Sequence, residues 1–438
     1  MGRIAIIAEN SVEYVEKILS IWECGNCAVL IDWRIPIQRA IEMMNEAEVT
    51  LCYVDRELNS DDIALAGEKI KFVVFEATRC ISEIPDSIKN KYQPNYSEAD
   101  ALILFSSGTT GASKGIILSY FAINTNADAI SEYMITEKKE CVYIVKSIAH
   151  SSTMVGELLV ALKNDLRIII GPTVVPPRII FSNIIKYSVT IICVNPALLG
   201  LLVDEYRVKL YEICSLKSIY VSGDIISTKQ IKIAREVLQG VNLYNVYGLT
   251  EAGPRVSAQR KGCSTNASVG KTLRNVEVSI RDNNGSILGE REYGNVYVRT
   301  PSLYKGYIVG KAKFSSYNSD ELNTGDIGYI DNGELFIVGR ADDVINVSAH
   351  KVYPKDVEKI ILDNLAIEEC AVVSEQYRGA VIIACYYVAD NDLDTSQLNI
   401  LNKYLANYEI PKRFYKVNNI AKTIMGKRDY KKLQEDHN

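Results

Sequence analysis

The sequence predicts an α/β protein with three parts: a large N-terminal body of doubly wound sheets, a small β-barrel-like unit, and a small α+β C-terminal domain on a hinge. Three observations lead to this prediction. Short apolar runs alternate with helical patterns in the first half, strands follow one another across tight turns after about residue 268, and the last hundred or so residues mix helices and strands. The expected boundaries are 1–340 for the N-terminal body, with about 270–340 as its β-rich unit, and 341–438 for the C-terminal domain.

The first half is expected to form parallel sheets. Residues 3–8 and 27–31 have the β-branched, apolar character of buried strands, and in residues 11–22 the apolar positions recur at helical spacing. A second helix is predicted over 37–47. Because strand and helix alternate, the strands should run parallel, with helices crossing over between them. Further strands of this kind are expected at 50–54, 101–105, 142–145, 166–170, 190–194 and 218–222.

The remainder of the chain has a different pattern. Turns such as Asp282-Asn283-Asn284-Gly285 separate short strands, which favours antiparallel hairpins. The segment 340–343 is short and hinge-like because no low-complexity linker surrounds it. The strands predicted here are 276–281, 294–299, 327–330, 335–338, 369–374 and 380–388, and the helices are 356–365 and 395–405.

Composition narrows the classes of function. The 438 residues are 47% hydrophobic and carry a net charge of -5, which argues against a nucleic-acid binder with a broad basic face. No apolar run reaches the roughly 18 residues of a membrane span, and the start is charged too early for a signal peptide, so the chain is expected to be cytoplasmic. The ten cysteines are scattered. Cys24 and Cys27 have C-x-x-C spacing without a second pair or nearby histidines, which favours a structural role over zinc or redox chemistry.

A glycine- and hydroxyl-rich loop is the most informative segment. It follows a predicted strand and contains glycines that allow backbone N–H groups to approach an anion, together with hydroxyl donors and one lysine. This is the chemistry that holds a polyphosphate, although the spacing is not that of a Walker loop and a plain surface turn is the alternative. The residues concerned are Ser106, Ser107, Gly108, Thr109, Thr110, Gly111 and Lys114.

The loop resembles the phosphate-binding loop of the adenylate-forming (AMP-binding) superfamily of acyl-CoA synthetases, peptide-synthetase adenylation domains and luciferase. Four further segments resemble motifs of that family and occur in the family's order. They are Tyr244-Asn245-Val246-Tyr247-Gly248-Leu249-Thr250-Glu251, Thr324-Gly325-Asp326, the segment 339–346, and the segment 422–427. The resemblance runs from about residue 3 to residue 433.

The resemblance implies an ATP-dependent ligase. A carboxylate attacks the α-phosphate of ATP to give an acyl-adenylate and pyrophosphate, and the acyl group then passes to the thiol of CoA or of a carrier-protein phosphopantetheine. Bringing two anions together requires positive charge and a metal. Lys114 and the loop hydroxyls are expected to hold the β- and γ-phosphates, Thr250 and Glu251 to act in catalysis, and Glu251 to ligate Mg²⁺.

Further residues are assigned to the nucleotide by the same resemblance. Tyr247 is expected to stack on adenine, within the segment that also supplies Asn245, Val246 and Gly248. Asp326 is expected to accept hydrogen bonds from the ribose hydroxyls, with Arg340 near the ribose and phosphate. Ser222, Gly223 and Asp224 are expected to line the other edge of the base, where the family usually has a small residue in place of Asp224.

The C-terminal motifs imply a moving domain. Lys427 is expected to bridge the carboxylate and the α-phosphate, with a solvated basic tail as the alternative. Asp342 resembles the hinge about which the domain rotates between half-reactions. Lys351 matches a basic position that touches the nucleotide phosphate, and Ala349 stands where the family has a glycine in its pantetheine tunnel.

Only two residues, His150 and Arg255, are predicted for the acyl pocket. His150 lies where relatives carry an aromatic or histidine gate, and Arg255 is expected either to face a polar acyl group or to form a structural ion pair. Amino-acid-activating relatives have an aspartate in this region, and the chain has none, so an α-amino acid is disfavoured as substrate.

Two alternatives accompany the leading prediction. The adenylate could pass to an amine or another non-thiol acceptor, or the chain could be a non-catalytic nucleotide-binding subunit. The chain also starts almost directly at the strand 3–8, where relatives have a preceding helix and hairpin. A homodimer or a partner protein is expected to cover the surface that this leaves.

Overall fold

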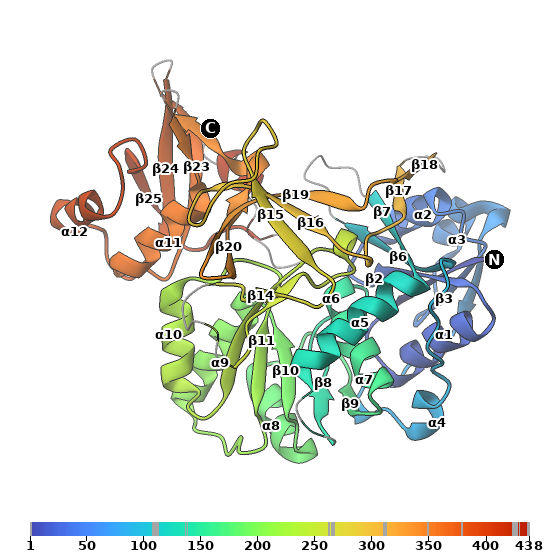
Figure 1. Ribbon diagram of the computed structural model, residues 1–438. Helices are drawn as coiled ribbons and strands as arrows, with labels where there is room; N and C mark the ends of the chain where they lie inside the picture. Colours follow the sequence, from blue (N-terminus) through green and yellow to red (C-terminus); the bar gives the residue numbers. More distant parts are fainter. Residues whose placement is uncertain are drawn as a thin grey trace.

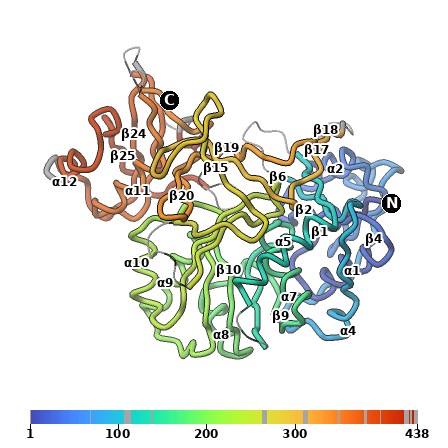
Figure 2. The backbone as a smooth tube through the Cα atoms, viewed as in Figure 1, coloured from blue at the N-terminus to red at the C-terminus, as the bar shows by residue number. Residues whose placement is uncertain are grey.

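The computed structural model describes residues 2–106, 114–135, 137, 139–261, 263, 268–309, 313–347, 350–377, 380–422, 428 and 430–435. Two eight-stranded sheets make up the N-terminal body, and the C-terminal elements, orange to red in Figure 1, lie at one end of it. The tube in Figure 2 shows the blue N-terminal part at the opposite end of the body.

The first sheet has the strand order β18-β17-β7-β6-β2-β1-β3-β4. Its central strands are parallel, with β1 paired to β2 on one side and β3 on the other, and β6 continues the parallel set beside β2. Antiparallel strands complete it from β7 onward. The bounds are β1 Arg3–Ala8, β2 Cys27–Asp32, β3 Leu51–Val54, β4 Lys71–Val74, β6 Asp100–Ser106, β7 Lys114–Ser119, β17 Gly306–Val309 and β18 Lys313–Ser316.

The second sheet has the order β14-β13-β12-β11-β10-β8-β9-β5. Its five central strands are parallel, whereas β13, β14 and β5 are antiparallel additions at the two edges. The bounds are β5 Ser82–Glu83, β8 Cys141–Tyr143, β9 Arg167–Ile170, β10 Ile191–Val194, β11 Ser218–Val221, β12 Asn242–Tyr247, β13 Ser257–Ala258 and β14 Lys271–Thr272.

Helices cover both faces of these sheets. Successive side chains of a strand point to opposite faces, so in β1 Ile6 and Ala8 enter the core between the two sheets while Ala5 and Ile7 face α2. The outer face of the second sheet packs on α8, α9 and α10. The helices of the body are α1 Val12–Glu23, α2 Ile37–Glu46, α3 Ser60–Ala66, α4 Asp86–Lys89, α5 Tyr120–Met134, α6 Ser151–Thr153, α7 Val160–Lys163, α8 Pro177–Tyr187, α9 Pro196–Val208 and α10 Thr228–Val237.

An antiparallel four-stranded sheet, order β15-β16-β19-β20, connects the body to the C-terminal domain. The latter has a two-stranded hairpin, a three-stranded sheet and an apolar core that α11 packs against. The bounds are β15 Glu277–Arg281, β16 Gly294–Arg299, β19 Glu321–Asp331, β20 Glu334–Arg340, β21 Ile345–Val347, β22 His350–Val352, β23 Glu369–Tyr377, β24 Ala380–Val388, β25 Arg413–Lys416, α11 Pro354–Asn364, α12 Thr395–Asn399 and α13 Tyr430–Glu435.

The predicted fold class is confirmed: both sheets of the body are parallel at their centres and have buried apolar residues on both faces. The long helix predicted over 395–405 was wrong. An Asp394–Gln397 capping box starts α12, but the α-helix ends at Asn399 and a 3₁₀ turn, Ile400–Lys403, follows. Leu398, Leu401 and Leu405 have a spacing that such a turn also accommodates.

Among the helices of the described residues, none combines the length and the apolar character needed to cross a bilayer.

Candidate active site

The two ends of the glycine-rich loop are held side by side. Ser106 is the last residue of β6 and Lys114 the first of β7, and the two residues are paired across these antiparallel strands. The intervening positions predicted to bind phosphate lie outside the described residues, as do two predicted C-terminal site residues. These positions are Ser107, Gly108, Thr109, Thr110, Gly111, Ala349 and Lys427.

Lys114 and Glu251 meet at a tyrosine. The Lys114 ammonium lies 5.3 Å from the ring centre of Tyr307 on β17, and the Tyr307 hydroxyl donates a hydrogen bond of 2.9 Å to Glu251 Oε1. Burial, and then the Glu251 carboxylate, raises the pKa of Tyr307, so this hydroxyl stays a donor at neutral pH. Tyr307 was not predicted from the sequence, which contains only two tyrosines three residues apart at this point.

Lys114 and Glu251 together have the chemistry needed to bind a polyphosphate that carries Mg²⁺. Among the described residues no carboxylate lies within ion-pair distance of the Lys114 ammonium, and no group of three metal-binding side chains is found. Mg²⁺ in nucleotide sites is usually held by one or two carboxylates together with the phosphates and water. A single glutamate beside an available lysine therefore suits Mg²⁺ that arrives with ATP.

Replacing Tyr307 with phenylalanine tests this arrangement. Groups that hydrogen-bond a metal ligand typically change metal affinity by about 10- to 100-fold, so we expect the Mg²⁺ concentration for half-maximal ATP turnover to rise by about tenfold. Tyr317→Phe is the matched control, because Tyr317 belongs to the same aromatic cluster but donates to the carbonyl of Glu321. An unchanged magnesium requirement in Tyr307→Phe would remove the case for Glu251 as ligand.

The predicted adenine and ribose residues form a hydrogen-bonded set. The Tyr247 hydroxyl, at the end of β12, donates to Asp326 Oδ2 over 2.5 Å, and Arg340 Nη1 lies 3.2 Å from Asp326 Oδ1. Burial, and then Asp326, raises the pKa of Tyr247. The structure thus brings together side chains from three predicted motifs, and Asp326 is the acceptor that they share.

The backbone around Asp326 and Tyr247 is fixed by close contacts. Thr324 Oγ1 accepts from the Asp326 N–H over 3.0 Å and donates to the carbonyl of Val296. Gly248 has no room for a side chain, since a Cβ there would lie 1.9 Å from the carbonyl oxygen of Pro254. The glycine of this motif is therefore required by packing.

The other residues predicted to surround the adenine lie in two segments, one at Ser222 and Gly223 and one at Asn245 and Val246 of β12. Ser222 Oγ accepts from the Lys146 ammonium over 3.3 Å, and Gly223 has a φ of +99° that favours glycine. Val246 is buried in the core, and the Asn245 amide donates to the carbonyl of Ser268, so both of these support β12.

The predicted gate His150 lies beside an unpredicted ion pair. His150 Nε2 is 3.7 Å from Asp32 Oδ2 at the end of β2, and Arg34 contacts both oxygens of that carboxylate at 2.7 and 2.8 Å. Burial works to raise the pKa of Asp32, but the hydrogen bonds and charge of Arg34 outweigh it and the pKa is lowered. The next residue, Ser151, has its Oγ 2.8 Å from Thr250 Oγ1, which connects this segment to the Thr250–Glu251 turn.

Arg255 is buried among charged groups. Only 3% of the residue is exposed, and its guanidinium lies against Gly156 in the π-helical turn Met154–Leu159. Glu157, which is fully buried, is 3.1 Å from the Lys146 ammonium. Burial raises the pKa of Glu157 although Lys146 and Arg255 oppose it. Among the described residues no carboxylate lies within ion-pair distance of the Arg255 guanidinium, and its buried Nε has no hydrogen-bond partner there. These contacts do not test whether Arg255 faces a polar acyl group.

Gly156→Ala tests how closely Arg255 is packed. A Cβ at Gly156 would lie 2.8 Å from Arg255 Nη2, and overpacking in a buried region costs about 1–3 kcal/mol. We expect urea unfolding to show a loss of that size. Gly200→Ala is the control: Gly200 lies in α9, and nothing lies within 4 Å of the position that an alanine methyl would take, so alanine there should stabilise by roughly 0.5–1 kcal/mol. Equal effects at the two glycines would contradict the packing argument.

The predicted hinge residue Asp342 and the predicted phosphate-contacting residue Lys351 are exposed. Asp342 lies in the 3₁₀ turn Ala341–Asp343 between β20 and β21, and Lys351 lies on β22 opposite Asn346. Within this hairpin His350 stacks on Tyr408, with ring centres 4.1 Å apart. Neither predicted role is tested by these contacts.

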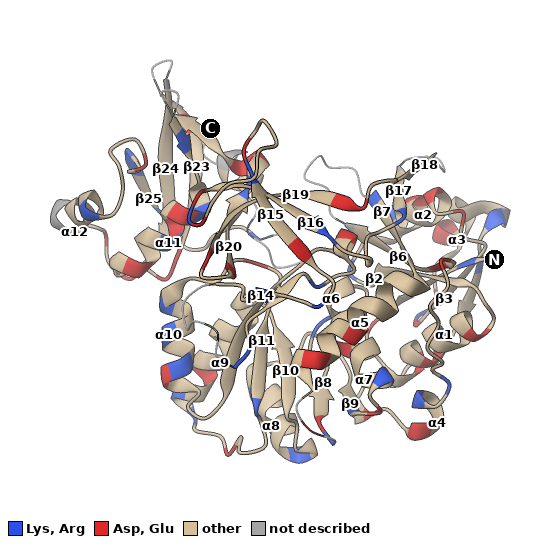
Figure 3. Ribbon diagram, in the orientation of Figure 1, with Lys and Arg blue, Asp and Glu red and all other residues tan. Residues whose placement is uncertain are grey.

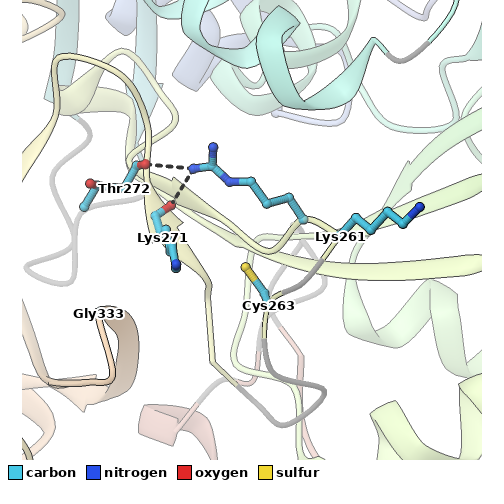
Figure 4. Close-up of a pocket in the computed structure, with 6 residues that line it drawn as sticks. Lys261, Cys263, Lys271, Thr272 and Gly333 are labelled. Carbon is cyan, nitrogen blue, oxygen red and sulfur yellow. Dashed lines mark hydrogen bonds between the residues drawn. The ribbon is translucent and has the colours of Figure 1, made fainter.

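A basic hollow of about 450 Å³ lies elsewhere on the body (Figure 4). The Arg260 guanidinium donates to the carbonyls of Lys271 and Thr272 at its edge. Lys261, Cys263 and Gly333 complete the lining, and no residue predicted for the active site is among them.

Lys114 and Glu251 both contact Tyr307, and Tyr247, four residues before Glu251 in the chain, donates to Asp326. The AMP-binding enzyme family matches residues 2–308, and the chain belongs to that family. The predicted family and the prediction that the chain is an enzyme are therefore confirmed.

Relatives of known activity match nearly the whole chain. The 2-succinylbenzoate–CoA ligase of Bacillus cytotoxicus is 25% identical, over 99% of this chain and 89% of that protein. Bacitracin synthase 2 of Bacillus licheniformis is also 25% identical, over 99% of this chain and 16% of that much longer protein.

Solved structures show the same fold. An anthranilate–CoA ligase in complex with anthranoyl-AMP has a TM-score of 0.87 and 19% identity, with coverage of 99% of this chain and 87% of that chain. An o-succinylbenzoate–CoA synthetase from Bacillus subtilis in complex with AMP has a TM-score of 0.81 and 20% identity, covering 98% and 87%.

Proposed function

We propose that the chain activates a carboxylic acid other than an α-amino acid with ATP and transfers the acyl group to the thiol of CoA. A carboxylate oxygen of the acid bonds to the α-phosphorus of ATP, and pyrophosphate leaves with the electron pair of the broken P–O bond. The CoA thiolate then bonds to the acyl carbon, and AMP leaves with the electron pair of the C–O bond.

The arrangement of Lys114, Tyr307 and Glu251 carries this proposal. Lys114, which has no carboxylate partner among the described residues, is available to bind phosphate oxygens, and Tyr307 holds the Glu251 carboxylate, which would ligate a metal that accompanies ATP. Mg²⁺ supplies Lewis-acid charge to the phosphates when it is bound. Asp326 holds two donors, Tyr247 and Arg340, which fixes its carboxylate for the ribose hydroxyls.

CoA is the favoured acceptor because the relatives with high coverage of their own length are named as CoA ligases. A carrier-protein phosphopantetheine, an amine acceptor, and a homodimer or partner at the N-terminal strand stay predictions. In the structure β1 is paired on both sides within its sheet.

ATP–pyrophosphate exchange over a panel of acids tests the proposal. The panel should include 2-succinylbenzoate, anthranilate, acetate and an α-amino acid such as phenylalanine, and Lys427→Ala provides the inactive control. Exchange with at least one non-amino acid, followed by thioester formation on adding CoA, supports the proposal. Tight ATP binding without exchange for any acid would make the chain a nucleotide-binding subunit, and exchange without thioester would leave a carrier or an amine as acceptor.

A further inference from the structure

Helix α11 of the C-terminal domain is attached at both ends to one short segment of the body. Near its start, the Lys355 ammonium lies 3.8 Å from Asp224 Oδ1. Near its end, Asp363 Oδ1 accepts from the Lys229 N–H over 3.0 Å, and the Lys229 ammonium donates to the carbonyl of Leu365 over 3.3 Å. Figure 1 shows α11 next to α10. Asp224 precedes α10 in the chain, and Lys229 lies in the first turn of that helix.

The second of these attachments suits the electrostatics of a helix end. Lys229 is the second residue of α10, and the first N–H groups of a helix have no partner within it. The Ser227 side chain accepts from the Gln230 N–H, and the Asp363 carboxylate accepts from the Lys229 N–H. A carboxylate at this end is also favoured by the helix dipole. Both α10 and α11 carry basic and acidic residues, blue and red in Figure 3.

The Asp224–Lys355 contact is connected through Glu358 to Arg428, the residue that follows Lys427 in the chain. Lys355 also lies 3.5 Å from Glu358 Oε2, and the same carboxylate oxygen accepts from Arg428 Nη1 over 2.6 Å. Tyr430 donates to Glu358 Oε1 over 3.0 Å. Glu358 is 1% exposed, so its partners are held in a fixed arrangement. Arg428 follows Lys427 in the chain.

We infer that Asp224 is a positioning residue: through Lys355 and Glu358 it holds α11 and Arg428 of the C-terminal domain against the body, beside the predicted adenine site. The inference rests on the proposed function and adds to it a role for Asp224 other than lining the base. Asp224 directly follows Ser222 and Gly223, so a contact made there places the C-terminal domain at the edge of the predicted adenine site.

A variant that removes the charge separates the two half-reactions. Partly exposed ion pairs contribute up to about 1 kcal/mol, so Asp224→Asn should slow ATP–pyrophosphate exchange by about fivefold. Transfer to CoA from a preformed acyl-adenylate, made with the acid that exchanges fastest, should stay within about twofold if the predicted hinge at Asp342 turns the C-terminal domain away from this contact for that step. Asp204→Asn is the matched control, since its exposed carboxylate pairs with Arg207 inside α9.

Asp224→Glu, which keeps the charge and leaves the Lys355–Glu358 pair intact, should retain exchange to within about threefold of wild type if the attraction itself is what matters. Equal slowing of both half-reactions by Asp224→Asn, or a loss in Asp224→Glu as large as that in Asp224→Asn, would overturn the inference.

A measurement without substrate keeps this test independent of the proposed function. Hydrogen exchange of the backbone in 354–364 and 430–435 should be faster in Asp224→Asn than in wild type and should stay near the wild-type rate in Asp224→Glu. Unchanged exchange rates in these segments would also overturn the inference. If wild type activates no acid, the proposed function fails, and this measurement still decides whether Asp224 holds the domain.

Discussion

Asp326→Ala is expected to weaken ATP binding by at least about 100-fold, because a hydrogen bond to a charged acceptor contributes about 1.5–3 kcal/mol and the two proposed ribose bonds would be lost. The same change removes the shared acceptor of Tyr247 and Arg340. Asp326 is only 7% exposed, so both donors would be left near a buried position. We therefore also expect the free energy of unfolding to fall by about 1–3 kcal/mol.

Isothermal titration with ATP and urea unfolding measure the two effects separately. Asp326→Asn keeps an acceptor oxygen and should have intermediate affinity. Asp331→Ala on the same strand is the matched control, because its surface pair with Arg291 should contribute little to either quantity. Unchanged ATP affinity in Asp326→Ala would show that the ribose lies elsewhere.

The strands of the parallel sheets could be predicted closely from the sequence. Buried parallel strands are continuous apolar runs, so 27–31 and 101–105 were recognised within a residue of Cys27–Asp32 and Asp100–Ser106. The strands β17 and β18 at the edge of the first sheet were not predicted. The described side chains of β18 are exposed, and β17 depends on pairing with β7, almost two hundred residues earlier in the chain.

The same long-range pairing explains why Tyr307 was missed. Local spacing identified Lys114 and Glu251 through motifs, but the residue that connects them lies on β17, where it is placed by the register of Tyr307 opposite Ile116. Asp32 and Arg34 were missed for a similar reason, since only the fold brings the end of β2 to His150. Asp224 was recognised as a departure from the family, yet its partner Lys355 lies on another domain and is separated from it by more than a hundred residues.

Lys427→Ala is expected to reduce adenylate formation by about 10²- to 10³-fold, the typical effect of removing one group that stabilises charge in a transition state. The reaction brings a carboxylate to a phosphate, and a lysine between the two anions lowers the barrier in that step. ATP binding, for which we propose Lys114 and Asp326, should change by less than about threefold because the proposed binding contacts do not include Lys427.

Single-turnover measurements distinguish this role from a solvated basic tail. Lys422→Ala is the matched control: it removes a lysine from the same motif, whose ammonium pairs with Glu369 over 2.7 Å at the surface. A basic tail would make the two variants alike, and each would have a small, salt-dependent effect. A catalytic Lys427 requires that its removal alone abolish pyrophosphate release, while thioester formation from a supplied acyl-adenylate continues. Since Arg428 is anchored to the buried Glu358, and Lys355 joins that carboxylate to Asp224, the removal of Asp224's charge should reproduce a fraction of the Lys427→Ala defect in the same half-reaction.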